Sequence, residues 1–379
     1  MTTGTPGAPT VGVVAEQLLR PVPGGIGRYV RALAEHLPAE AAIDGGAARF
    51  LVCRHPADRV AAVGLPPAAT VRLPWPGRLA TRTWVTLRRP RLPSGLLDTL
   101  DLVHATSAAV PPVRGQALVA TVHDLAFRHH PDAYPAAGRR YHDRAARIVA
   151  SEAARILVPS VATAQDLAEL YAVDRGRVTI VPLGVQPPAQ PDRRGAARLL
   201  HDHGVRGPFL LAVGTLEPRK NLPRLLAAFG EVTDELPDHW LVVVGPVGWG
   251  PKLRPTWESV RVKLAGPVGD ATLHALYEQA DGLAYPSLYE GFGLPVLEAM
   301  AHGTPVLTSD RSSLPEVAGD AALLVDPLDR GAIAKGLHRL VSDGDLRERL
   351  AVAGPRRAAA FTWRATAAAT WATYCEVAR

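Results

Sequence analysis

The sequence has little cysteine and no long apolar run. Its two cysteines, Cys53 and Cys375, lie far apart and match no metal-binding or redox spacing, so we expect a reduced, cytoplasmic protein without a structural disulfide. No uninterrupted apolar run approaches the roughly 20 residues that a helix needs to cross a bilayer. Residues Met1–Pro9 lack the basic-then-apolar order of a signal peptide. The chain is therefore expected not to span a membrane, although it can still lie on one.

A large excess of one charge is also absent. The 379 residues include 42 basic and 36 acidic side chains, a formal charge of +6. This modest excess suits a polyanionic ligand or an anionic surface equally well, and it does not indicate nucleic acid. A hydrophobic content of 47% with 21% charged residues is ordinary for a folded α/β protein, and the length allows two domains with a core each.

Two series of short, apolar, β-branched segments alternate with helix-like segments along the chain. Uninterrupted apolar strands of this kind indicate parallel sheets that helices cover on both faces. The first series comprises Thr10–Val14, Phe50–Cys53, Leu102–Ala105, Ala117–Val122, Arg155–Pro159 and Val178–Val181. The second series comprises Phe209–Val213, Trp240–Val244, Val262–Leu264, Gly282–Tyr285, Pro305–Thr308 and Ala322–Val325.

A polar, proline-rich stretch, Gln186–Gly195, separates the two series. We therefore predict two doubly wound α/β domains, residues 1–187 and 196–360, that meet at a cleft. In such sheets ligands bind at the carboxyl ends of the strands. Residues 361–379 are predicted to form a final helix that packs back toward the first domain. Its apolar face would comprise Phe361, Ala365, Ala368, Ala369, Ala372 and Cys375.

The most informative motif contains two glutamates, Glu290 and Glu298, with seven residues between them. Pro295 suits the first turn of a helix over Val296–Ala301, which places Glu298 close to the start of that helix. The glycines of the stretch Gly291–Pro295 allow a tight backbone path whose N–H groups can approach an anion. A carboxylate on each side of such a loop can bind hydroxyls on two parts of one ligand. This arrangement suits a sugar nucleotide.

A second motif, Gly214–Leu222, directly follows a predicted strand and contains Arg219, Lys220 and Asn221. Asn221 is expected to cap a helix over Leu222–Phe229. A guanidinium and an ammonium above a helix start would hold a diphosphate and stabilise the charge on a phosphate leaving group. The alternative is a solvated pair on a loop. The position at a strand's carboxyl end, in the same half as the two glutamates, favours the ligand site.

Two weaker signals lie in the first half of the chain. His123-Asp124 follows a predicted strand, where an imidazole can reach a sugar hydroxyl, and a structural histidine is the alternative. The stretch Gly24-Gly25-Ile26-Gly27 opens a predicted amphipathic helix over Arg28–Leu37 and does not match the dinucleotide-binding pattern. On its own this stretch is an ordinary helix entry, but such a glycine-rich loop can also lie across a diphosphate held by the second domain.

The segment Val71–Gly95 is basic and contains no acidic residue. Arginines with interleaved tryptophans are typical of a segment that rests on an anionic bilayer surface, and a solvated face of an arginine-rich protein is the alternative. Peripheral contact with the inner face of a membrane is therefore one of two interpretations of this segment. Its arginines and tryptophans are Arg72, Arg78, Arg82, Arg88, Arg89, Arg91, Trp75 and Trp84.

The ordered set of motifs resembles that of the retaining glycosyltransferases of family GT4. The resemblance covers nearly the whole chain and rests on Gly24–Gly27, His123-Asp124, Val181–Val185, Arg219–Asn221 and the pair Glu290-x7-Glu298. It implies the GT-B fold, two Rossmann-like domains that face each other across a cleft. It also implies a nucleotide-sugar donor held mainly by the second domain and an acceptor held mainly by the first.

The resemblance further implies roles for the residues that handle the nucleotide. Arg219 and Lys220 would hold the diphosphate, Glu298 would hold the ribose hydroxyls, and Gly25 would approach the phosphates. The sequence has no Asp-x-Asp pair at a strand end, and the family that it resembles needs no metal and no cofactor besides the nucleotide sugar. The basic pair would then neutralise the departing phosphate. Front-face attack on the sugar would retain its configuration without an enzymic nucleophile.

By the same resemblance, Glu290 and the backbone of Phe292, Gly293 and Leu294 would contact the transferred sugar, and His123 would bind it near its reacting carbon. Within the family, the chain is most like bacterial polysaccharide mannosyltransferases. GDP-mannose is therefore the preferred donor and a UDP-hexose the next. The acceptor is expected to be a hydroxyl of a glycan, a glycolipid or other lipid-linked molecule, or a small molecule.

Two other interpretations remain open at this point. The first is another GT-B enzyme, such as a sugar-nucleotide epimerase or a phosphorylase, although no lysine lies in a motif that would support a pyridoxal phosphate Schiff base. The second is a non-catalytic sugar-nucleotide-binding or scaffold protein. It would bind the donor without turning it over.

Overall fold

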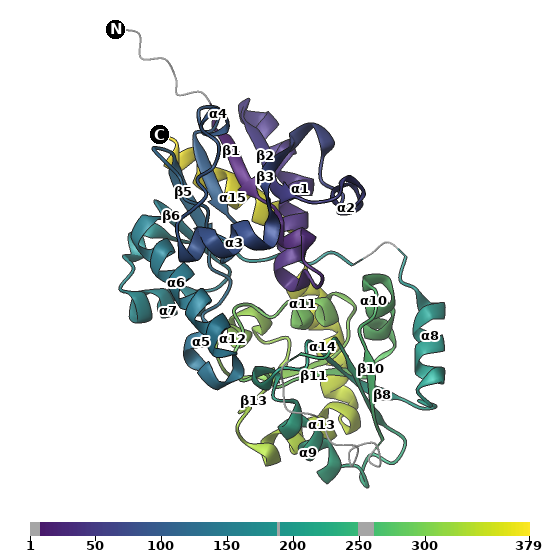
Figure 1. Cartoon of the computed structure of the whole chain (residues 1–379). Coiled ribbons are helices and arrows are strands. Elements are labelled where there is room, and N and C mark those ends of the chain that lie inside the picture. Colours follow the sequence, from purple (N-terminus) through teal and green to yellow (C-terminus); the bar gives the residue numbers. More distant parts are fainter. Residues whose placement is uncertain (1–7, 188–189, 249–260) are drawn as a thin grey trace. The chain divides into compact units, whose positions relative to one another are not determined.

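A computed structural model describes residues 8–187, 190–248 and 261–379. Most of the N-terminal stretch, part of the predicted linker and a segment of the predicted second domain lie outside these described residues. The chain divides into two compact units (Figure 1). The first comprises the chain up to Arg128, Pro135–Gly184 and Thr362–Arg379. The second comprises His129–Tyr134 and Val185–Phe361.

The first unit is built on a seven-stranded parallel sheet. In spatial order its strands are β3 (Thr70–Pro76), β2 (Ala47–Arg54), β1 (Thr10–Val14), β4 (Leu102–Ala105), β5 (Ala117–Thr121), β6 (Arg155–Val158) and β7 (Val178–Ile180). Its helices are α1 (Gly24–Asp44), α2 (Ala57–Ala62), α3 (Gly77–Thr86), α4 (Ser94–Leu97), α5 (Ala126–His129), α6 (Ala136–Glu152), α7 (Val161–Tyr171) and α15 (Trp363–Val377).

The second unit is built on a six-stranded parallel sheet. In spatial order its strands are β10 (Val262–Gly266), β9 (Trp240–Val244), β8 (Phe209–Val213), β11 (Gly282–Tyr285), β12 (Val306–Ser309) and β13 (Leu323–Val325). Its helices are α8 (Arg193–Asp202), α9 (Leu222–Glu231), α10 (Asp270–Gln279), α11 (Leu294–Ala301), α12 (Leu314–Ala318), α13 (Arg330–Ser342) and α14 (Gly344–Ala358). The two parallel sheets confirm the predicted α/β class.

The edge strand β3 was not predicted. Arg72, Pro74 and Pro76 interrupt its apolar pattern, and an edge strand tolerates proline because one side of it needs no hydrogen bonds. The basic segment Val71–Gly95 therefore begins inside the sheet. The membrane prediction for Trp84 is wrong, because this side chain is 0% exposed and packs in the core.

Helix α1 begins four residues earlier than predicted. Gly24–Gly27 form its first turn, so the predicted glycine-rich loop does not exist in that form. Gly27 has to be glycine at this place because a Cβ would lie 2.3 Å from the Cβ of Pro23. Gly25 lies exposed in the first turn, where helix N–H groups have no partner within the helix.

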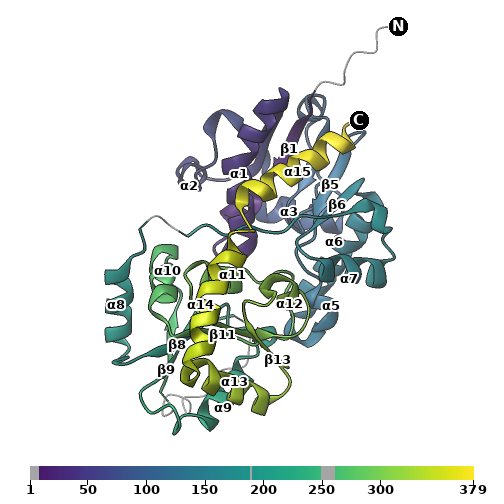
Figure 2. The ribbon, with the colours of Figure 1, turned by 180° about the vertical axis from the view of Figure 1, so that it is seen from behind.

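The C-terminal helix α15 packs in the first unit, where it lies along α1 (Figure 2). The predicted apolar face is wrong, because Ala365 and Ala372 are exposed and Trp371 and Tyr374 are buried instead. Two large rings bury more apolar surface than a row of alanines does. Buried threonines on the same face cost little, since Thr370 Oγ1 donates to the carbonyl of Thr366 at 2.7 Å. Within the described residues, no helix has both the length and the apolarity that a membrane crossing requires.

Candidate functional site

The second unit gathers the predicted phosphate-binding residues at the carboxyl edge of its sheet. Arg219 and Lys220 lie in the loop between β8 and α9, and Glu290 lies in the loop between β11 and α11. Because β8 and β11 are paired neighbours in the sheet, their loops emerge side by side. The main-chain N–H of Leu288 donates to the carbonyl of Arg219 at 2.8 Å and joins the two loops directly.

These residues form one buried cluster of charges. Lys220 Nζ donates to Glu290 Oε1 at 2.6 Å and to the hydroxyl of Tyr285 at 2.5 Å. The Tyr285 hydroxyl in turn donates to Glu290 Oε1 at 2.8 Å. Arg219 Nη1 lies 2.5 Å from Glu290 Oε2, and its Nη2 lies 2.7 Å from Oε1 of Glu217. Two cations therefore face two carboxylates, and both oxygens of Glu290 are engaged.

The charges in this cluster set the ionisation of Glu290. Burial by itself would raise the pKa of Glu290, but Arg219 and Lys220 outweigh it and lower the pKa to about 2. Burial lowers the pKa of Lys220, and the Glu290 carboxylate opposes that shift. Burial and the same carboxylate raise the pKa of Tyr285 well above its usual value. Glu290 is therefore ionised at neutral pH and holds no proton to donate.

Two serines hold the loop that carries Glu290. Ser312 Oγ accepts from the main-chain N–H of Glu290 at 2.9 Å. Ser313 Oγ lies 2.9 Å from the carbonyl oxygens of both Glu290 and Phe292. Ser312 has a φ of 53°, a left-handed conformation that a non-glycine residue adopts only at some cost. The sequence suggested no role for these serines, because their spacing from the glutamates belongs to no motif.

Helix α11 begins directly after this loop. Gly293 precedes the helix with a φ of 112°, and a Cβ there would lie 2.7 Å from Cδ2 of Leu314, so the backbone requires glycine. Pro295 lies in the first turn, which confirms the prediction. Glu298 lies in the second turn, is buried, and accepts from the hydroxyl of Tyr277 at 3.0 Å. Leu294 is likewise buried.

Asn221 takes the predicted N-cap position of helix α9, but its side chain makes no capping hydrogen bond to the helix. Its Nδ2 donates instead to the carbonyls of Pro286 at 3.0 Å and Pro327 at 2.7 Å. Arg224 Nη1 donates to its Oδ1 at 2.5 Å. Asn221 therefore ties the loop after β8 to the loops after β11 and β13, which a helix cap would not do.

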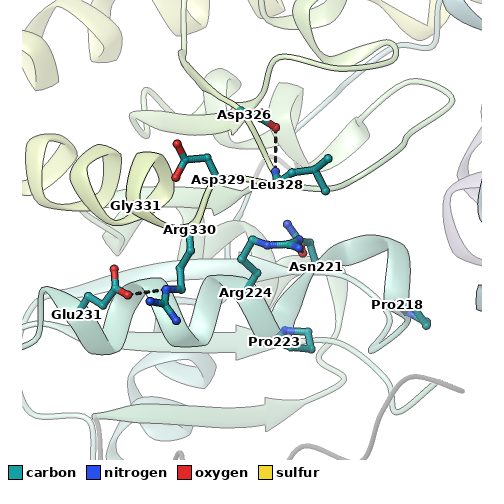
Figure 3. Close-up of a pocket in the computed structure, with 10 residues that line it drawn as sticks. All are labelled: Pro218, Asn221, Pro223, Arg224, Glu231, Asp326, Leu328, Asp329, Arg330 and Gly331. Atoms are coloured by element: carbon teal, nitrogen blue, oxygen red, sulfur yellow. Dashed lines mark hydrogen bonds and ion pairs between the residues drawn. The ribbon is translucent and has the colours of Figure 1, made fainter.

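A pocket of about 990 Å³ opens beside this site, between the starts of α9 and α13 (Figure 3). Its lining includes Arg224 and Arg330 but not the cluster of Arg219, Lys220 and Glu290. Arg330 is paired with the carboxylate of a lining glutamate, and Arg224 donates within the wall. The full lining is Pro218, Asn221, Pro223, Arg224, Glu231, Asp326, Leu328, Asp329, Arg330 and Gly331.

The first unit holds His123 in one defined tautomer. His123 follows β5, and its Nε2 lies 2.9 Å from the carbonyl oxygen of Thr106. Since a carbonyl only accepts, Nε2 carries the proton. Burial lowers the pKa of His123, with the Thr106 carbonyl and Asp124 opposing the shift. The ring is therefore neutral at neutral pH, and its Nδ1 is a hydrogen-bond acceptor. Such a group accepts from a hydroxyl and donates nothing to it.

A buried chain of polar side chains that the sequence did not predict supports this histidine. The Tyr29 ring packs edge-on against His123 with the ring centroids 5.0 Å apart, and its hydroxyl lies 2.9 Å from Thr121 Oγ1. His104 Nε2 lies 2.8 Å from the same oxygen, and its Nδ1 lies 2.6 Å from the hydroxyl of Tyr374. Burial lowers the pKa of His104 to about 3. This chain links α1, β4, β5 and α15 around His123.

The structure thus brings Arg219, Lys220 and Glu290 together in the second unit, with Glu298 on the adjoining helix. His123 and Gly25 belong to the first unit. Cys53 and Cys375 are both free. Over the described ranges, no group of three or more His, Cys, Asp or Glu side chains has the geometry of a metal site.

Known proteins match both halves of the chain. Residues 201–357 match the family model described as glycosyl transferases group 1, and residues 23–187 match the model described as glycosyltransferase family 4. The O-antigen chain mannosyltransferase B of Escherichia coli is 32% identical over 281 residues, which are 71% of this chain and 72% of the relative. The MMP alpha-(1->4)-mannosyltransferase of Mycolicibacterium hassiacum is 32% identical over 310 residues, which are 76% of this chain and 74% of the relative.

A solved structure shows the same fold. Anabaena HepE, solved in complex with UDP and glucose, matches with a TM-score of 0.71 at 17% identity, over 96% of this chain and 99% of that one. An identity this low supports a statement about architecture alone. Together with the two parallel sheets, the match confirms the predicted GT-B fold.

Proposed function

The chain belongs to the group 1 glycosyltransferases of family 4, and from this premise we propose that it is a retaining hexosyltransferase that moves mannose from GDP-mannose to a hydroxyl of a glycan or lipid-linked acceptor. The observation that carries the proposal is the buried cluster of Arg219, Lys220 and Glu290. A fork-shaped guanidinium and an ammonium, both held in place before a ligand arrives, suit the diphosphate of a nucleotide sugar.

In the proposed reaction, the bond between the anomeric carbon and the phosphate oxygen breaks as the acceptor oxygen forms its bond to that carbon. The acceptor proton passes to the departing phosphate oxygen on the same face of the sugar. Arg219 and Lys220 stabilise the negative charge that grows on the leaving diphosphate. Glu290 positions the sugar and does not attack it, because both of its oxygens are engaged by cations and by Tyr285. His123 Nδ1 accepts from a sugar hydroxyl.

Mannose is proposed as the transferred sugar because two relatives over 30% identical are named mannosyltransferases. A UDP-hexose is the next choice of donor. No metal is assigned a role in the proposed reaction. The cationic side chains supply the charge that a divalent ion supplies to a diphosphate in other enzymes.

A thermal-shift panel of nucleotide sugars tests the donor. GDP-mannose is expected to stabilise the protein most, by about 2.7 kcal/mol at a concentration one hundred times its Kd. Glu298→Ala is expected to weaken donor binding roughly tenfold to a hundredfold, because a buried carboxylate that bonds the ribose is lost. Each variant is compared with its own ligand-free Tm, and Glu348→Ala, at an exposed glutamate of α14 that is outside the pocket lining, is the matched control.

Stabilisation by a UDP-hexose in place of GDP-mannose would reject the proposed sugar and base while leaving the phosphate site in place. Wild-type donor affinity in Glu298→Ala would reject the ribose assignment. A panel in which no nucleotide sugar stabilises the protein would reject the proposed donor site altogether.

We also propose that the surface of α3 and the residues after it rest on an anionic membrane. Leu79 and Leu87 are 58% and 66% exposed, and the arginines Arg78 and Arg82 are exposed beside them. Arg88 does not contribute, because it pairs with Glu152. Apolar side chains flanked by arginine suit the boundary between lipid headgroups and acyl chains.

Sedimentation with vesicles tests this surface. The protein is expected to bind vesicles that contain phosphatidylglycerol, to bind pure phosphatidylcholine poorly, and to lose binding as salt increases. Leu79→Glu is expected to abolish most of the binding, whereas Val352→Glu, at a 50% exposed residue of the second unit, keeps it. Equal binding by the two variants would reject α3 as the membrane-facing surface.

A further inference from the structure

Arg20 is a half-buried cation with almost no partner of its own. It ends the short turn Glu16–Leu19 that follows β1, at the carboxyl edge of the sheet of the first unit. Over the residues that the structure describes, its guanidinium makes a single hydrogen bond, from Nη2 to Thr81 Oγ1 at a long 3.4 Å. No carboxylate of those residues lies within ion-pair distance of it.

Some partly buried arginines of the first unit have a carboxylate beside them, and Arg177 donates instead to the main-chain carbonyl of Ala153. Arg88 pairs with Glu152, and Arg155 lies 3.5 Å from a carboxylate oxygen of Glu376. Removing a guanidinium from water without a partner costs free energy, so proteins normally supply a carboxylate. Among the described residues, Arg20 has neither a carboxylate nor a short hydrogen bond, and it lies at the edge of the sheet where ligands of this fold class bind. That combination points to an anion that comes from outside the chain.

The turn that carries Arg20 is fixed by buried polar groups. Glu16 is buried, and its Oε2 accepts from the main-chain N–H of Cys53 at 2.9 Å while its Oε1 lies 2.7 Å from Nε2 of His55. Arg59 Nη2 donates to the carbonyl of Leu19 at 2.7 Å. These bonds join the turn to β2 and α2, so the backbone beneath Arg20 is held before any ligand binds. A preorganised cation loses little entropy on binding.

Two side chains of α6 belong to the same neighbourhood as Arg20: the Tyr141 hydroxyl and Arg20 both contact Thr81, and the ring of His142 packs edge-on against that of Tyr141 with the centroids 5.6 Å apart. Burial raises the pKa of Tyr141 to about 12, with the charge of Arg20 acting in the opposite direction. Burial lowers the pKa of His142, which Asp124 raises and Arg20 lowers further. The charges of Asp124 and Arg20 therefore act on His142 in opposite directions. The Tyr141 hydroxyl is anchored 3.1 Å from the carbonyl oxygen of Thr81, in the same residue whose hydroxyl Arg20 contacts.

We propose that Arg20 and His142 bind a phosphate group on the acceptor, with Asp124 accepting from a hydroxyl next to that phosphate. The proposal rests on the proposed function in one respect, that the first unit takes the acceptor. A planar carboxylate would occupy the guanidinium fork alone, whereas a tetrahedral phosphate has further oxygens to offer the imidazole. The phosphate belongs to a soluble phosphorylated sugar or polyol, or to the phosphate link of a lipid carrier, and both sources share this chemistry.

The ring of His142 is a built-in reporter for this site, because an anion beside it raises its pKa. In protein labelled with ¹³C-histidine, the His142 signal is assigned by its loss in His142→Gln. Titration with inorganic phosphate is expected to shift the His142 signal until the site is saturated. Chloride at the same ionic strength is the control. Arg20→Gln is expected to weaken the response roughly tenfold or more, as loss of a charge-assisted hydrogen bond does, and Arg49→Gln, at an exposed arginine of β2, to leave it unchanged.

Two further probes separate the sources of the phosphate. A hexose 6-phosphate that binds more tightly than inorganic phosphate assigns a soluble acceptor. A prenyl phosphate in detergent that binds more tightly than the hexose phosphate assigns a lipid carrier. The inference fails if the His142 signal responds equally to chloride, or if Arg20→Gln responds like the wild type.

This experiment uses no donor, so its result is independent of the donor assignment. A protein that shows the Arg20-dependent response but is not stabilised by any nucleotide sugar would reject the proposed donor site and keep the phosphate subsite. A protein that GDP-mannose stabilises but whose His142 signal ignores phosphate would reject the subsite and keep the donor site.

Discussion

Replacing Lys220 by alanine is expected to lower kcat by roughly 10²–10³-fold, about 3–4 kcal/mol, as removal of one preorganised donor to a developing oxyanion does. Lys220 Nζ is held by Glu290 Oε1 at 2.6 Å and by the Tyr285 hydroxyl at 2.5 Å, so its position is set before the donor arrives. The donor KM should change much less than kcat, because the charge on the leaving diphosphate grows mainly in the transition state.

Release of the nucleotide from the donor, measured under initial-rate conditions, gives both constants. Lys335→Ala is the matched control, since it removes an exposed lysine of the same unit. An unchanged kcat in Lys220→Ala would remove this residue from the chemistry. An unchanged kcat with a large rise in KM would make it a binding group alone.

The second large effect is expected at Glu290. Glu290→Gln should destabilise the second unit by about 3–5 kcal/mol at neutral pH, because it removes one partner of a buried ion-paired cluster and leaves Lys220 without a carboxylate. Glutamine fills the same volume, so the loss reports charge. Urea unfolding of wild type and variant at a series of pH values measures it.

The pH dependence of this difference has a definite sign. The pKa of Glu290 is lowered from 4.5 to about 2 in the folded protein, so its ion pairs contribute fully above about pH 4.5. Their contribution falls as the pH drops toward 2, and the gap between wild type and Glu290→Gln should close over that interval. Glu235→Gln, at an exposed glutamate near His338, is expected to show no such gap. A gap that stays constant from pH 6 down would contradict the ion-paired state of Glu290.

Much of the fold follows from local sequence pattern. Strands such as Thr10–Val14, Phe209–Val213 and Gly282–Tyr285 have the predicted bounds, because each is a continuous apolar run that is buried on both faces. β3 was not predicted because an edge strand does not need a continuous apolar run. The buried face of α15 was predicted wrongly because a helical pattern of apolar residues gives alanine the same weight as a large ring. The structure buries the largest rings, those of Trp371 and Tyr374.

Site residues that belong to a sequence motif could be predicted. Site residues that are brought in by tertiary contacts could not. Arg219, Lys220 and Glu290 were named from their places after strands, and the structure brings them together. Ser312 joins the site only through a contact between two loops, which the spacing of one sequence does not reveal. Glu217 pairs with Arg219 inside the loop after β8, and only the structure shows that contact.

The first unit shows the same limit more strongly. His123 stood out because it follows a predicted strand at the carboxyl edge of the sheet, where ligands bind. The chain of Tyr29, Thr121, His104 and Tyr374 that supports it joins residues up to 270 positions apart. Arg20 stood out only after the structure showed which arginines have a carboxylate partner.

The central claim is that the basic pair after β8 holds the donor diphosphate. A crystal structure with bound GDP tests it most directly. If the claim holds, phosphate oxygens will lie within about 3 Å of the Arg219 guanidinium and Lys220 Nζ, at hydrogen-bond distance. A diphosphate bound instead in the neighbouring pocket, against Arg224 and Arg330 with the ion pairs of Glu290 undisturbed, would contradict it.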